Sequence, residues 1–121
     1  MKLFVIIGAV LAGTAVLLGA FGAHGLKSRL SVEDLNIFET AVRYQMYHAL
    51  AILIIGVIGY YLSHQSLLIP AYFFIAGVVF FSGSLYLLIF TQHRWLGAIT
   101  PVGGVFLFLG WILFAINIYK S

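Results

Sequence analysis

The sequence predicts an all-α membrane protein, an antiparallel four-helix transmembrane bundle with a long, polar-headed second helix. Hydrophobic residues make up 64% of the 121 residues and charged residues only 7%, whereas soluble domains carry about 25% charged residues. The apolar residues also form four continuous runs, each near the roughly 20 residues with which an α-helix crosses the hydrocarbon core. Continuous runs favour helices over the alternating strands of a membrane barrel.

The four runs fit one transmembrane domain over residues 1–121. Its spans are expected at about 3–23, 44–62, 67–90 and 96–118. The first run follows a lysine, as in a secretory signal, but it exceeds the roughly 7–15 residues of a signal's apolar core, so we interpret it as a span. The connections 63–66 and 91–94 are short, which makes the helices that they join antiparallel neighbours.

Small residues at helical spacing line one face of the first run. They are Gly8, Ala12, Ala15, Gly19 and Gly22. In lipid, small residues allow close approach of helix backbones, so this face is expected to pack against a neighbouring helix. The glycines towards residue 25 predict a C-cap and a tight turn after the helix.

A polar helical head at about 32–43 precedes the second span. Ser31 is placed to cap this helix, with Asp34 at the third helical position. No Gly or Pro occurs from residue 32 to residue 55, so we expect one long helix whose first turns lie at the membrane interface. Glu39 and Arg43 are four residues apart, in the favourable order for an ion pair.

Two polar side chains follow inside the second span. Gln45 and His48 share a helix face with Phe38, Ala41 and Ile52. Polar groups in a membrane are costly and usually face the protein interior. We therefore expect Gln45 and His48 on the close-packed face, away from lipid.

If the four spans are antiparallel, most polar side chains gather at one end of the bundle. The candidate binding residues there are His24, Glu39, Arg43, Gln45, His48 and Thr100, with His93 and Arg94 nearby. Ionisable groups at membrane depth are candidates for function. A structural interpretation is also open, in which His24 and His48 form hydrogen bonds between helices, with Gln45 and Thr100 as partners.

The segment 100–104 allows two interpretations. It could be a broken-helix substrate site with backbone groups lining a cavity. It could also be a plain helix that begins at Pro101 and packs through Gly103 and Gly104.

Several classes of protein are disfavoured. The chain has no cysteine, no HExxH motif, no phosphate-binding glycine loop with lysine and no serine elbow. We therefore expect no enzyme, no catalytic residues, no metal site and no cofactor. No basic run exists, so nucleic acid is not an expected partner. The expected partners are the lipid bilayer and a second copy or another membrane protein.

Basic residues indicate the orientation in the membrane. Four of them, Lys27, Arg29, Arg43 and Arg94, fall in the connections 24–43 and 91–94, against Lys2 and Lys120 at the other side. By the positive-inside rule, the long loop 24–43 is expected in the cytoplasm and both termini outside.

Four motifs carry a resemblance to a known family. They are GAFGAHGL at 19–26, YQMYHAL at 44–50, SGSLY at 82–86 and LGAITPVGG at 96–104, followed by Gly110-Trp111. They resemble the YwdK/YgdD-like small bacterial inner-membrane proteins, a family catalogued as a domain of unknown function. The resemblance implies a four-span protein of the bacterial cytoplasmic membrane and supplies no activity.

Three functions are left open by the sequence. The preferred hypothesis is a compact bundle that stabilises the membrane or binds a lipid or protein partner. The alternative is a small transporter or channel component for a proton, ion or small solute, using the polar cluster at the 24–43/91–94 end. A haem or metal protein that uses His24 and His48 is the third.

Overall fold

The computed structural model describes residues 1–62 and 64–121, and the side chains of all of these except Ala23 and His64. The described residues form helices and no strand. The four long helices are α1 (Lys2–Phe21), α2 (Val32–Ile58), α3 (His64–Thr91) and α4 (Thr100–Lys120). A π-helical turn, η1 (Gly22–Leu26), follows α1, and a 3₁₀ turn, η2 (Arg94–Ala98), precedes α4. The described chain has four helices long and apolar enough to cross a membrane, which confirms the all-α class.

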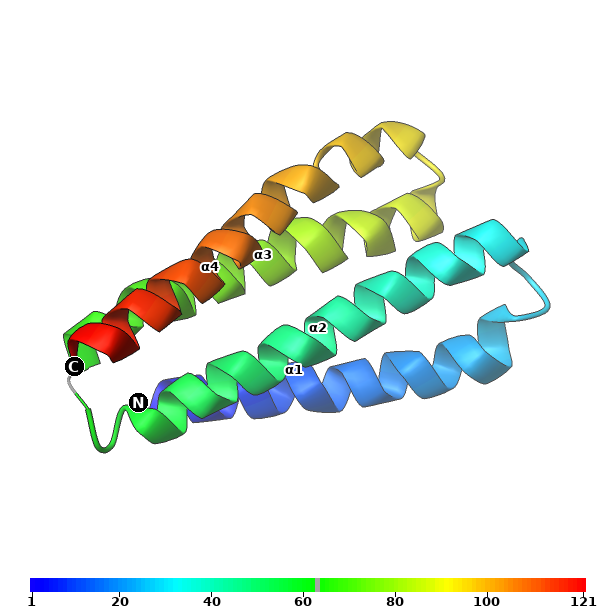
Figure 1. Cartoon of the computed structure of the whole chain (residues 1–121). Helices are drawn as coiled ribbons and strands as arrows, with labels where there is room; N and C mark the ends of the chain where they lie inside the picture. The colour runs from blue at the N-terminus through cyan, green and yellow to red at the C-terminus, as the bar shows by residue number, and fades with distance from the viewer. Residues whose placement is uncertain (63) are drawn as a thin grey trace.

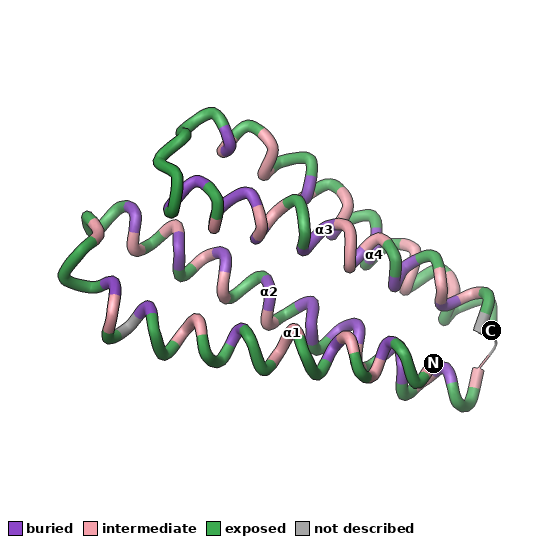
Figure 2. The backbone as a smooth tube through the Cα atoms, turned by 180° about the vertical axis from the view of Figure 1, so that it is seen from behind, coloured by how far each residue is buried: buried purple, intermediate pink, exposed green. Residues whose placement is uncertain are grey.

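The helices form two antiparallel hairpins, α1–α2 and α3–α4, which are joined where α2 packs against α3 (Figure 1). Both termini lie at one end, and η1 and η2 lie at the other, which we call the polar end. In the most apolar 18-residue stretch of each helix, 44% of the residues are buried for α2 and for α3. The corresponding fraction is only 17% for α1 and for α4. The outer helices therefore offer most of the surface to lipid, as the exposed stretches in Figure 2 show.

The small-residue face of α1 packs against α2, as predicted. A Cβ atom at Gly8 would lie 2.8 Å from the carbonyl oxygen of Ala49, and Ala15 is 1% exposed. A glycine also allows close backbone contact in the second hairpin, because a side chain at Gly103 would collide with the backbone of Phe81. Close backbone approach thus holds each hairpin together.

The start of α2 follows the prediction, and the end of α1 follows it only in part. Ser31 Oγ accepts a hydrogen bond from the backbone N–H of Asp34 at 3.1 Å, and α2 continues unbroken to Ile58. Gly22 is the C-cap of α1, as predicted, but the tight turn does not follow, because Gly22 keeps φ −62° and the chain continues into η1. No described glycine has positive φ, so glycine is not required here for a left-handed conformation. Gly22 is needed for space instead, because a Cβ there would collide with the Phe38 ring.

Two apolar clusters divide the interior. The larger contains Ile52, Ile55, Leu67 and Phe74, and the smaller, at the polar end, contains Phe38, Leu88 and Leu96. Between them, α2 and α3 bury Gln45, His48 and Ser82. We call this set, with the side chains that bond to it, the polar layer.

Candidate functional site

Gln45 is the centre of the polar layer and joins three helices. Its Nε2 donates to the backbone oxygen of Leu11 at 2.9 Å and to Thr14 Oγ1 at 2.8 Å, both on α1. Its Oε1 accepts from the hydroxyl of Tyr86 on α3 at 2.7 Å. The side chain is 4% exposed. Both amide protons and the amide oxygen therefore have partners within the protein.

His48 joins α2 to α4. Trp111 Nε1–H donates to His48 Nε2 at 3.0 Å, and His48 Nδ1 lies 2.8 Å from the backbone oxygen of Tyr44. Because Nε2 accepts and a carbonyl oxygen cannot donate, this geometry assigns the proton of a neutral imidazole to Nδ1. Phe74 and Trp111 enclose the ring, with centroids 5.5 Å and 5.8 Å away. The indole N–H of Trp111 therefore faces the bundle interior.

Two serines complete the layer. Ser82 Oγ donates to the backbone oxygen of Ala41 at 2.7 Å, and Ser84 Oγ lies 2.6 Å from Thr100 Oγ1. Within the described part of the chain, no buried side-chain nitrogen or oxygen lacks a hydrogen-bond partner. The layer therefore leaves no free polar group facing the apolar interior.

These contacts correct the prediction of one polar cluster at the polar end. Gln45 and His48 do lie on the buried face, but a rise of about 1.5 Å per residue places them about 20 Å and about 24 Å along α2 from Val32. His24 is exposed in η1. The predicted bonding partners are also wrong, because His48 bonds to Trp111 and Thr100 bonds to Ser84. The described residues bring together no group of three His, Cys, Asp or Glu suited to a metal ion.

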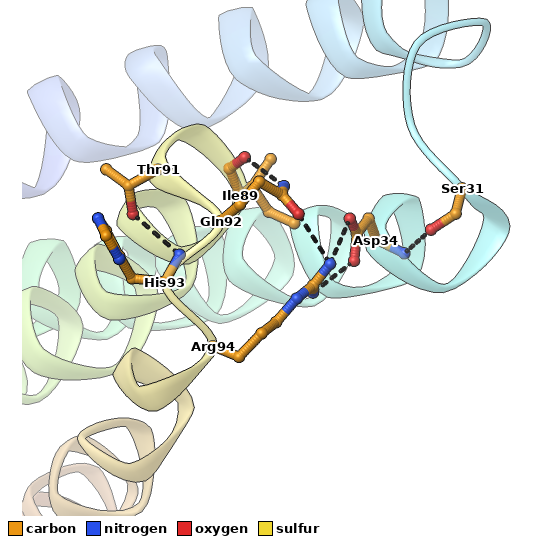
Figure 3. Close-up of polar contacts among 7 residues, drawn as sticks. All are labelled: Ser31, Asp34, Ile89, Thr91, Gln92, His93 and Arg94. Atoms are coloured by element: carbon orange, nitrogen blue, oxygen red, sulfur yellow. Dashed lines mark hydrogen bonds and ion pairs between the residues drawn. The ribbon is translucent and has the colours of Figure 1, made fainter.

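The charged residues at the polar end pair differently from the prediction. The Glu39–Arg43 ion pair does not form, and Arg43 Nη2 instead donates to Thr40 Oγ1 at 3.4 Å. Arg94 donates to both carboxylate oxygens of Asp34, at 2.7 Å and 3.0 Å, which ties η2 to the head of α2 (Figure 3). Gln92 supports Arg94 by accepting from its Nη2 at 2.8 Å. Sequence reasoning assigned Asp34 only to the helix start and missed this pair.

Pro101 occupies the first turn of α4, and the buried Gly103 packs against α3. Segment 100–104 is thus a helix start, as the plainer of the two interpretations predicts.

A groove of about 400 Å³ lies at the polar end between α2, α3 and the start of α4. Its α2 wall is mostly polar, and its α3 floor is apolar. The wall consists of Glu33, Asn36, Ile37 and Thr40, the floor of Phe81 and Leu85, and Thr100 closes the α4 side. We call it the head groove. Of the predicted site residues, Thr100 lines it and Arg43 reaches its wall through Thr40.

A second groove, of about 480 Å³, lies between α3 and η2. Its lining is almost entirely apolar and includes Phe80, Leu87 and Leu96. Such a surface suits a hydrocarbon chain, but it has few polar groups that could fix the orientation of a bound ligand.

Comparison with known proteins places the chain in a family. The family model described as "Protein of unknown function (DUF423)" matches residues 18–104. The chain belongs to the DUF423 family. This DUF423 chain is 51% identical to a UPF0382 membrane protein of Staphylococcus aureus (strain bovine RF122 / ET3-1), over 99% of the chain and 98% of the relative. No solved structure matches it.

A second relative confirms the resemblance stated from the motifs. The UPF0382 membrane protein YwdK of Bacillus subtilis (strain 168) is 45% identical to this DUF423 chain, over 99% of the chain and 98% of the relative. The names of both relatives and the four apolar helices support a multi-pass membrane protein.

Proposed function

We propose that this protein is a membrane bundle that acts by binding a phospholipid in the head groove. The observation that supports this is the division of the groove into a polar wall on α2 and an apolar floor on α3. An amphiphile matches such a surface, because its polar group can lie along Asn36 and Thr40 while its chains cover Phe81 and Leu85. The proposed role includes no catalytic step.

The same proposal gives the polar layer a structural role. Gln45 bonds to α1 and α3, and His48 Nε2 accepts a hydrogen bond from Trp111 on α4. Neither side chain lines either groove. In lipid, such interhelical bonds stabilise association by about 0.6–2 kcal/mol each. The layer would thus hold the two hairpins in the arrangement that forms the head groove.

Transport of a proton, ion or small solute is the second candidate. The polar layer favours it, because Gln45, His48 and Tyr86 lie at mid-depth in the bundle. A proton on Nε2 of His48 would have to displace the Trp111 hydrogen bond, which makes this candidate the weaker one. Flux into proteoliposomes that falls with His48→Ala but not with Glu39→Gln would favour transport over lipid binding.

The proposed location is the bacterial cytoplasmic membrane, with the loop 24–43 in the cytoplasm and both termini outside. The basic residues of the polar end support this orientation. The absence of native cysteine makes single-cysteine labelling clean. In intact cells, an impermeant thiol reagent should label Ser121→Cys and leave Ser28→Cys unlabelled. The reverse labelling pattern would show that the loop 24–43 lies outside and both termini lie in the cytoplasm.

Native mass spectrometry of the protein extracted from its own membrane tests lipid binding. We expect one phospholipid to be retained per chain, and the same spectrum reports any homo-oligomer or protein partner. Thr40→Trp fills the groove and should remove the lipid. Val32→Trp is the matched control, since Val32 is on the same helix, 79% exposed and outside the groove. Equal lipid retention by Thr40→Trp and the wild type would refute the proposed function.

A further inference from the structure

The polar wall of the head groove carries opposite charges at different depths. Glu33 lies in the first turn of α2, and Thr40 lies two turns further into the helix, about 10 Å along its axis. The Arg43 guanidinium donates to the Thr40 hydroxyl, so its positive charge lies near the inner part of the wall. The wall is therefore negative towards the helix end and positive towards the membrane.

In the described part of the chain, Glu33 is not held in an ion pair. Arg94 lies close enough to Glu33 to interact electrostatically. However, its guanidinium makes a bidentate ion pair with Asp34, at 2.7 Å and 3.0 Å. Glu33, Asp34 and Arg94 together carry one net negative charge, and the Glu33 carboxylate is exposed and lines the groove.

Arg43 likewise has its charge available. Its guanidinium donates one long hydrogen bond, to Thr40 Oγ1 at 3.4 Å, and in the described part of the chain it forms no ion pair with an acid. Long basic side chains in a membrane extend towards the interface, and for Arg43 that direction is also towards Thr40, one turn nearer the start of α2. The guanidinium is a strong and preferred partner for a phosphate group.

We propose that the head groove selects a zwitterionic phospholipid with a primary ammonium, of the phosphatidylethanolamine class, with its ammonium at Glu33 and its phosphate at Arg43. The inference rests on the proposed function. In such a lipid the chains, the phosphate and the ammonium follow one another outwards. The groove offers the apolar floor of Phe81 and Leu85, then Arg43 beside Thr40, then Glu33.

The groove chemistry separates this headgroup from two others. A primary ammonium has three hydrogen-bond donors for the Glu33 carboxylate and the Asn36 amide oxygen, whereas a quaternary choline has none. Choline is recognised by aromatic rings, and the outer wall has none among Glu33, Asn36 and Ile37. An anionic headgroup without an amine would place no positive charge against Glu33.

Headgroup competition on the full-length protein tests the inference. The purified protein is incubated in mixed micelles with equal amounts of phosphatidylethanolamine, phosphatidylcholine and phosphatidylglycerol of identical chains, and bound lipid is read by native mass spectrometry. We expect the ethanolamine lipid to exceed each competitor by about fivefold, the scale of a partly exposed ion pair. Glu33→Gln should bring the ethanolamine-to-choline ratio close to one.

Two further variants give the controls. Glu39→Gln removes an exposed acid of the same helix that does not line the groove, so the ratio should stay at its wild-type value. Arg43→Gln should lower binding of all three phospholipids while leaving the ethanolamine-to-choline ratio unchanged. A ratio that does not respond to Glu33→Gln, or that responds equally to Glu39→Gln, overturns the inference.

The two proposals fail in different ways. If Thr40→Trp removes a lipid whose headgroup shows no ethanolamine preference, the groove binds lipid and only the selectivity is wrong. If Thr40→Trp leaves the bound lipid in place, the lipid lies elsewhere and both are wrong. A lipid-free dimer that Thr40→Trp dissociates would assign the groove to a second copy of the chain and overturn both.

Discussion

The polar layer and the head groove contain similar side chains in opposite situations. In the layer, Gln45 is 4% exposed and each of its amide groups has a partner on another helix. In the groove, Glu33 and Asn36 are exposed on the wall of an open space. The difference indicates that the polar side chains buried between the helices hold the helices together. The polar side chains at the start of α2 remain free to contact a ligand.

The largest effect is expected from Gln45→Ala. The substitution removes three hydrogen bonds and leaves the Tyr86 hydroxyl without its acceptor in the interior. We expect a loss of about 2–3 kcal/mol in unfolding free energy. Chemical unfolding in detergent measures it. Asn36→Ala is the control, an amide on the same helix but exposed, and its effect should stay within about 0.5 kcal/mol. Equal losses of unfolding free energy in Gln45→Ala and Asn36→Ala would contradict the proposed difference between the polar layer and the head groove.

An intermediate effect is expected at the contact between α2 and α4. A double-mutant cycle with His48→Ala and Trp111→Phe isolates the hydrogen bond between Trp111 Nε1 and His48 Nε2. The coupling energy should be about 0.6–1.7 kcal/mol, the range of interhelical bonds in membranes. Additive losses would mean that the two side chains contribute only by packing.

The smallest effect on stability is expected at the polar end. Arg94→Gln removes the ion pair with Asp34, in which the Arg94 side chain is 55% exposed and the Asp34 side chain 9% exposed, so water and salt reach the pair from the Arg94 side. The melting temperature should fall less than in Gln45→Ala, and the difference from the wild type should shrink as salt is raised. Glu39→Gln should leave the melting temperature unchanged at every salt concentration. If the fall in melting temperature of Arg94→Gln does not depend on salt, Arg94 stabilises the protein by packing and not by its charge.

Local patterns predicted the features that depend on neighbours in the sequence. The Ser31 cap, the unbroken α2, the small-residue face of α1 and the buried face of Gln45 and His48 all follow from spacing along one helix. These features depend on the 3.6-residue repeat and on side chains a turn apart.

Features that depend on the packing of different helices were missed. His48 and Trp111 are 63 residues apart, and Asp34 and Arg94 are 60 apart, so no local period relates either pair. Glu39 and Arg43 have the spacing of an ion pair, yet Arg43 turns to Thr40. Similarly, α3 ends where Gln92 adopts φ 60°, a conformation that glycine usually supplies.

The His48–Trp111 hydrogen bond also bears on biogenesis. During synthesis α2 leaves the ribosome before α4 exists. Gln45 can then find Thr14 in the helix that precedes it, but His48 Nε2 has no partner until a residue 63 positions later has been made. An insertion intermediate that ends before α4 would hold an unpaired imidazole nitrogen in the bilayer. The last helix to be synthesised therefore supplies the hydrogen bond that satisfies this nitrogen in the middle of the bundle.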